Sequence, residues 1–74
     1  MYERHDLIWD GRRLRLFSRS GRVLASIEPD RAWPGMWRVR LPDGYLTDMV
    51  NLSRARDAAA SLALTVLNKH REAA

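Results

Sequence analysis

The sequence predicts an α+β protein in which an antiparallel meander of four to five short strands is covered on one face by a single C-terminal helix. Short segments that alternate apolar and polar residues fill the first two thirds of the chain, and turn sequences rich in glycine, proline and aspartate separate them. After residue 53 the apolar residues change to a helical spacing. A sheet with one apolar and one charged face needs a cover on the apolar side only, so one helix is enough.

The predicted strands cover residues 7–9, 12–17, 22–28, 36–41 and 45–50. Asp10-Gly11 predicts a two-residue turn after the first strand, because this pair readily adopts the positive φ angles of a tight hairpin. In the third strand Val23, Ala25 and Ile27 alternate with other residues, so we expect these three side chains on one face of the sheet.

The helix is expected to begin at Ser53, whose hydroxyl is suited to cap the first turn. At 100° per residue, one side of this helix carries small and aliphatic side chains, namely Ala55, Ala58, Ala59, Leu62, Ala63 and Val66. The alanines would let the helix approach the sheet closely. Leu64 lies on the opposite side of the helix and is a candidate contact for a protein partner or a second copy.

The chain of 74 residues predicts one domain over residues 1–74, with residues 1–5 and 70–74 frayed. It contains no cysteine, which excludes disulfides and thiolate metal sites and favours the cytoplasm. The charged N-terminal residues do not resemble a signal peptide, and no apolar run approaches the roughly 18 residues of a membrane span. We therefore expect a cytoplasmic protein without a membrane partner.

The net charge of +4 is concentrated in residues 1–40, where nine arginines stand against five acidic residues. On the expected sheet, Arg13, Arg15, Arg38 and Arg40 project from the face opposite the helix, together with Phe17. Arginine binds phosphates and can read base edges, so this face is a candidate nucleic-acid surface. The alternative interpretation is a solvated face whose arginines keep the sheet from aggregating.

The longest irregular segment, residues 28–35, is the best single place for a specific loop contact, because loops often carry function. Its candidate contact residues are Arg31 and Trp33. The alternative is that the segment is a connector whose Trp33 plugs the end of the sheet.

Catalytic, cofactor and metal sites have no motif in the sequence. His5 and His70 lie near opposite ends, and no nucleophile set, glycine-rich phosphate loop or ligand cluster is present. The sequence predicts a non-enzymatic binding or accessory module without cofactor or metal. Weak nucleic-acid binding through the arginine face is the first hypothesis. The alternative is protein–protein interaction or homodimerisation, through a sheet edge or the Leu64 side of the helix.

The segments Trp-Pro-Gly-Met-Trp-Arg-Val-Arg (33–40) and Asp-Met-Val-Asn-Leu-Ser-Arg-Ala-Arg-Asp-Ala-Ala (48–59) resemble small uncharacterised bacterial and prophage-type proteins. In those proteins tryptophan-containing strands lead into an alanine-rich helix, and no function is assigned. The order of elements over residues 36–67 is also similar to the plant ethylene-response DNA-binding domain and the arm-binding domain of tyrosine integrases. That architecture implies a sheet face turned to DNA, although the glycine-aromatic pattern of those domains is replaced here by Leu-Thr-Asp-Met.

Overall fold

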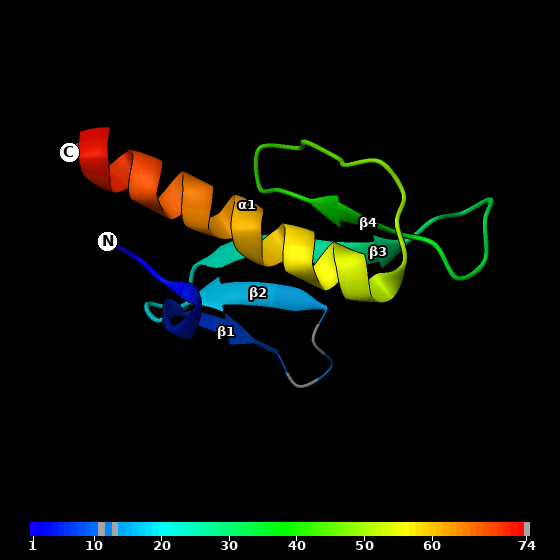
Figure 1. The fold of residues 1–74 in the computed structure, drawn as a ribbon, viewed down its shortest axis with the longest axis horizontal. Coiled ribbons are helices and arrows are strands. Elements are labelled where there is room, and N and C mark those ends of the chain that lie inside the picture. The colour runs from blue at the N-terminus through cyan, green and yellow to red at the C-terminus, as the bar shows by residue number, and fades with distance from the viewer. Residues whose placement is uncertain (11, 13, 74) are drawn as a thin grey trace.

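The computed structural model describes residues 1–10, 12 and 14–73, with side chains up to residue 69, and it confirms the predicted class. Four antiparallel strands form one open sheet in the order β1-β2-β3-β4, and one long helix lies across one face (Figure 1). The elements are a 3₁₀ turn η1 (Arg4–Asp6), β1 (Leu7–Trp9), β2 (Arg15–Ser18), β3 (Val23–Pro29), β4 (Trp37–Arg40) and α1 (Leu52–Ala73). The helix packs on β3 and β4, less on β2, and leaves β1 to one side.

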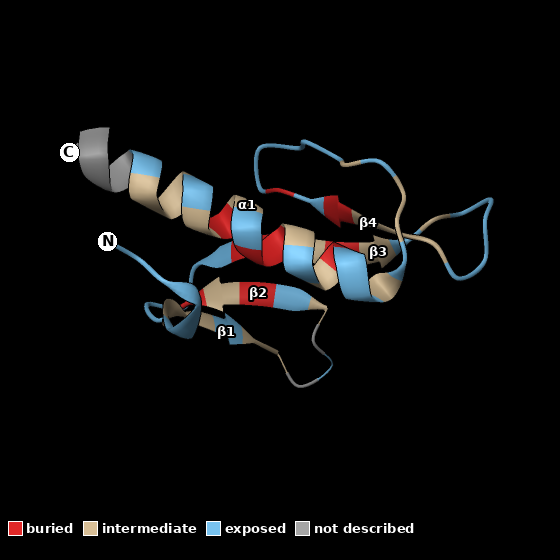
Figure 2. Cartoon of the chain, in the orientation of Figure 1, coloured by how far each residue is buried: buried red, intermediate tan, exposed pale blue. Residues whose placement is uncertain are grey.

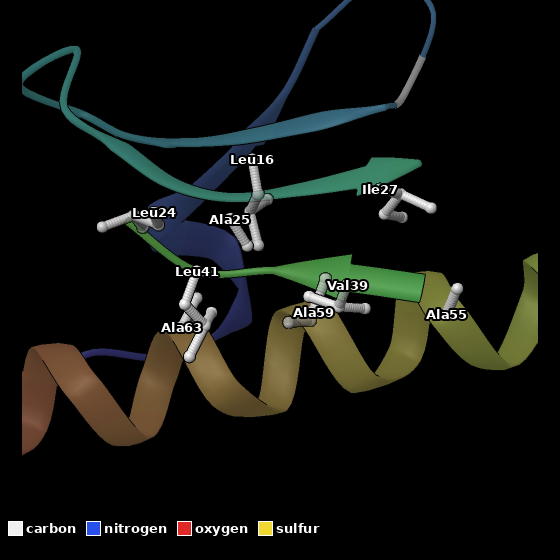
Figure 3. Close-up of a cluster of buried hydrophobic side chains, with 10 residues drawn as sticks. Leu16, Leu24, Ala25, Ile27, Val39, Leu41, Ala55, Ala59 and Ala63 are labelled. Atoms are coloured by element: carbon white, nitrogen blue, oxygen red, sulfur yellow. The ribbon is translucent and has the colours of Figure 1, made fainter. Parts of the chain in front are cut away.

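The core lies between α1 and the central strands (Figure 2). Leu16 and Val39 are its largest side chains without exposed surface. On the helix, the predicted small residues Ala55, Ala59 and Ala63 are fully buried, which brings the helix backbone close to β4 (Figure 3). The sequence therefore identified the buried side of the helix and, apart from Val23, the covered face of the sheet.

The predicted two-residue turn at Asp10-Gly11 is wrong, because Trp9 pairs with Leu16 and the connection between β1 and β2 is longer; Gly11 itself lies outside the described residues. The pairing of β1 with β2 ends at Asp10, whose N–H donates to the Arg15 carbonyl at 3.1 Å. One carboxylate oxygen of Asp10 accepts hydrogen bonds from the N–H groups of Arg12 and Leu14, both at 3.0 Å. This side-chain bonding stabilises a longer connection, and so β2 starts later than predicted.

The alternation predicted that Val23 shares a face with Ala25 and Ile27. In the structure Val23 lies on the opposite face. The register shifts between Leu16, which pairs with Ala25, and Phe17, which pairs with Val23. This β-bulge buries Leu24 beside Ala25 and turns Val23 outward, so that Val23 is 41% exposed. Simple alternation fails wherever such an extra residue interrupts the ladder.

The segment 45–50 is held to β4 by two isolated bridges, Trp37 with Val50 and Arg40 with Leu46, rather than by a fifth strand. Between them the Thr47 hydroxyl, rather than a backbone carbonyl, accepts the hydrogen bond of the Val39 N–H at 2.9 Å. A side chain has replaced the backbone acceptor, and the ladder is not regular.

The helix begins at Leu52, and Ser53 is not its cap. The side-chain oxygen of Asn51 accepts a hydrogen bond from the Arg54 N–H at 2.8 Å, which is the contact of an N-cap residue. Of the N-terminal residues expected to fray, Tyr2 and Arg4 bond to side chains of the helix. The Tyr2 N–H donates to the Asn68 side chain at 2.8 Å, and α1 itself continues to Ala73.

Candidate functional site

The predicted arginine face is assembled on the side of the sheet away from α1. Arg15 pairs with Ser26, which pairs with Arg40 on the next strand, so the three lie in one row across the sheet. Arg38 shares this face, because the residue between Arg38 and Arg40 is buried toward the helix. Arg13 lies outside the described residues.

Two of these arginines are engaged by carboxylates of the same chain. Arg40 forms a fork with Glu28, in which Nε and Nη2 each donate to a carboxylate oxygen at 3.0 Å. Arg38 donates from Nε to Asp30 at 2.8 Å and from Nη1 to the Thr47 carbonyl at 2.9 Å. Their guanidinium donors are therefore already partly occupied.

These hydrogen bonds lower the pKa values of the two carboxylates, Glu28 and Asp30. The hydrogen bond from Arg40 is the main cause that lowers the pKa of Glu28 below its ordinary value. The hydrogen bond from Arg38, followed by the one from the Ala32 N–H, lowers the pKa of Asp30. Both acids are ionised at neutral pH. The face carries three described arginines and two carboxylates, a formal charge of only +1.

The loop between β3 and β4 presents the two predicted loop contacts to solvent. One oxygen of Asp30 accepts the N–H groups of Ala32 at 2.9 Å and Trp33 at 3.0 Å, which orders the loop from within. Trp33 is 60% exposed, so it does not plug the end of the sheet. Arg31 is exposed as well. The loop lies beyond one end of the sheet, on the β4 side (Figure 1).

The predicted partner residue Leu64 is half-buried. The exposed side of the described helix is polar and consists of Ser53, Arg54, Asp57, Ser61, Thr65 and Lys69. This side of α1 therefore offers little apolar surface for a partner.

A row of apolar side chains that the sequence reasoning missed lies on the open face beside β1. Ile8 pairs with Phe17, and Phe17 pairs with Val23, so one side chain from each of three neighbouring strands lines up. Ile8 is 48% exposed, Val23 is 41% exposed and Phe17 is half-buried. We call Ile8, Phe17 and Val23 the apolar row. The apolar run at 7–9 gave a signal for Ile8, whereas Val23 joins the row only because of the bulge.

The backbone of β1 next to the apolar row forms an edge of the sheet. Because Asp10 and Arg15 are a hydrogen-bonded pair, the alternation of an antiparallel ladder turns the peptide groups of Ile8 toward β2 and those of Leu7 and Trp9 outward. The Leu7 N–H is already donated to the Arg4 carbonyl. Among the described residues, no hydrogen bond is recorded to the Leu7 carbonyl or to the N–H and carbonyl of Trp9, so the edge offers these groups.

On the helix side of β1, a shallow hollow of about 440 Å³ lies between the strand and the start of α1. Its lining residues are Arg4, Trp9, Ser53, Arg54, Arg56, Asp57 and Ala60. Arg4 is paired with Asp57 at 2.7 Å, whereas Arg54 and Arg56 have no ion pair with any described residue. The Nε atom of Arg56 is buried and has no hydrogen-bond partner there. Nothing in the sequence alone brought these residues to β1.

Within the described residues, no three histidine, cysteine, aspartate or glutamate side chains gather in a group that could hold a metal ion. Among the described helices, none combines the length and the apolar character needed to span a bilayer. Comparison of this chain with protein-family models, with curated proteins and with solved structures found no match.

Proposed function

We propose that this protein is a non-enzymatic binding module that docks a protein segment at the β1 edge and the adjoining apolar row. The observation that carries the proposal is the placement of three partly exposed apolar side chains, in register across three strands, beside a strand edge with outward peptide groups. Sheet edges pair readily with extended segments, and clustered apolar surface commonly marks an interaction site.

The docking surface is small, because β1 has only three residues. A segment added to this edge gains few backbone hydrogen bonds, each contributing on the order of 1 kcal/mol. Contact with the apolar row must supply much of the remaining affinity. We therefore expect weak, reversible binding of a short extended segment.

A selection from a random-peptide phage library tests the proposal. Peptides enriched on the wild-type protein should shift the backbone amide signals of residues 7–9 in ¹⁵N-labelled protein. The variant Ile8→Lys should weaken their binding by about tenfold or more, since it places a charge in the apolar row.

The matched control is Leu46→Lys, which places the same charge at another partly exposed aliphatic residue, beside β4. It should leave the affinity for the peptides within about twofold of wild type. Both variants should retain the wild-type urea midpoint. Three outcomes would contradict the proposal. The enriched peptides bind Ile8→Lys as tightly as wild type, they shift only amides of α1 or of the β3–β4 loop, or no peptide is enriched at all.

Nucleic-acid binding through the open face is a second candidate, supported by Arg15. This residue is exposed, lies on the predicted face and has no carboxylate partner among the described residues. A DNA duplex should then bind more weakly as salt rises from about 50 to about 200 mM, because phosphate contacts release counterions. Arg15→Glu should abolish this binding, and so should the double change Arg38→Glu/Arg40→Glu. Binding that is indifferent to salt, or no binding at low salt, would remove this candidate.

A further inference from the structure

We infer that the segment docked at β1 carries acidic side chains on the side facing α1 and apolar side chains on the side facing the apolar row. This inference rests on the proposed function and adds the chemistry of the partner. It follows from three features of β1: the direction of its free peptide groups, the charge on its helix side and the apolar surface on its open side.

The free peptide groups determine how an added strand would lie. Trp9 turns both its N–H and its carbonyl outward, so it would form a hydrogen-bonded pair with one residue of an antiparallel partner strand. The side chain of that residue lies on the same face as the Trp9 side chain, which packs against the core on the helix side. The neighbouring residue of the partner lies opposite Ile8, on the open face.

The helix side of this position has an excess of positive charge. Three arginines and one carboxylate line the hollow there, a formal charge of +2, compared with +1 on the sheet face that the sequence had singled out. Arg54 is exposed without an ion pair, and Arg56 keeps a buried Nε–H group that no described acceptor reaches. A buried guanidinium donor without an acceptor is unfavourable, and a carboxylate is its strongest partner. A glutamate or aspartate opposite Trp9 brings a carboxylate to the hollow, where the exposed guanidinium group of Arg54 can pair with it.

The open side of the same strand selects the alternate residues of the partner. Ile8 and Phe17 leave apolar surface next to the edge, so the residue opposite Ile8 is expected to be apolar. In a strand, successive side chains point to opposite faces. An alternating acidic and apolar segment therefore satisfies both sides at once.

A second copy of this chain does not match the surface as well. Antiparallel pairing of β1 with the β1 of another copy would place Leu7 or Trp9 of that copy on the helix side. Neither residue is acidic, so Arg54 and Arg56, which have no ion pair with any described residue, would gain no carboxylate from the paired strand. The charge thus favours an acidic segment of another protein.

The test uses the chain of 74 residues and three end-blocked synthetic heptapeptides. One alternates valine and glutamate, one alternates valine and lysine, and the third is the valine–glutamate peptide with alternate amides N-methylated. Binding is measured by the chemical shifts of the backbone amides of residues 7–9 and of the arginine Nε–H groups. The valine–glutamate peptide should bind at least about tenfold more tightly than the lysine peptide, and N-methylation should abolish its binding.

Two variants locate the charge recognition. Arg54→Gln/Arg56→Gln should remove most of the preference for glutamate over lysine. Because Arg56 is partly buried, Arg54→Gln alone serves as a second variant that leaves the packing unchanged and should lower the preference in part. Arg31→Gln, at an exposed arginine in the β3–β4 loop, is the matched control and should leave the preference unchanged.

The outcomes separate the two proposals. Equal binding of the glutamate and lysine peptides at residues 7–9 would overturn the acidic chemistry while leaving edge docking intact. Tight binding of the N-methylated peptide, or shifts only outside residues 7–9, would overturn edge docking itself. No binding of either peptide at millimolar concentration would overturn the inference. Dimerisation of the protein that Ile8→Lys abolishes would overturn it too, and so would a DNA duplex that displaces the glutamate peptide from Arg54.

Discussion

At the β4 edge of the sheet, Trp37 and Val50 exchange two backbone hydrogen bonds of 2.7 and 2.8 Å, and the segment 45–50 covers the strand. At the β1 edge, Trp9 turns its peptide groups outward, and no described strand lies beside it. Both edges carry a tryptophan packed against the same core. One of them is closed by the chain itself, whereas no segment among the described residues pairs with the other.

The arginines near the two edges also differ, because those at β4 are paired with carboxylates and Arg54 near β1 is not paired with any described one. On the β4 side Arg38 and Arg40 are held by Asp30 and Glu28, whereas near β1 the guanidinium group of Arg54 has no described partner. An alternating arginine pattern therefore does not by itself give the net charge of a face, because acids of the neighbouring strand and of the loop after it can pair with the arginines. Near β1, the positive charge of Arg54 has no such compensation among the described residues.

The largest expected effect concerns the core that both edges share. Leu16→Ala should lower the free energy of unfolding by about 2–5 kcal/mol, because it leaves a cavity under α1. Ile8→Ala, in the apolar row, should change it by about 0.5 kcal/mol or less. Urea denaturation followed by tryptophan fluorescence measures both. If Leu16→Ala does not fold, Leu16→Val makes the same comparison with a smaller deletion, and equal effects at the two positions would contradict the assigned faces.

A medium effect is expected from opening the covered edge. Thr47→Val keeps the side-chain shape but removes the acceptor of the Val39 N–H, and leaving that buried donor unpaired should cost about 1–3 kcal/mol. The exchange of the Val39 amide proton should also accelerate. Thr65→Val is the control, because among the described residues the Thr65 hydroxyl bonds only to the Ser61 carbonyl on the exposed side of α1, and its loss should be nearly neutral. Unchanged exchange at Val39 would show that Thr47 does not close this edge.

The smallest effect concerns the ion pairs on the β4 side. The pKa of Glu28 is lowered in the folded protein by the Arg40 hydrogen bond, so the folded state resists protonation and stability should fall as the pH drops below about 4.5. Glu28→Gln should flatten this part of the pH dependence and, because the pair is solvent-exposed, should change the stability at pH 7 by under about 1 kcal/mol. Thermal unfolding between about pH 3 and pH 7 is the measurement. A pH profile identical to that of wild type would mean that the pair contributes no measurable stability.

Local rules predicted the class of the fold because the residues that encode it act over short distances. The alternation around Leu16 and Val39 and the helical spacing of Ala55, Ala59 and Ala63 each require one buried face, and burying those faces together leaves few arrangements. Side-chain hydrogen bonds defeated the same rules in detail. Asp10 lengthened a turn, Asn51 replaced Ser53 as the cap, and Thr47 interrupted a ladder.

The sequence by itself determined that a basic, cysteine-free chain forms a sheet with one face covered by a C-terminal helix and the other face open. Only the tertiary structure decided which arginines on the open face are paired with a carboxylate. Glu28 on β3 lies opposite Arg38 on β4 and accepts two hydrogen bonds from Arg40 on the same strand. The tertiary structure also decided that the bulge turns Val23 toward Phe17 and Ile8, and that Arg54 lies near β1. Alternation and composition are local properties, whereas charge compensation and exposed apolar surface depend on which distant residues the register places side by side.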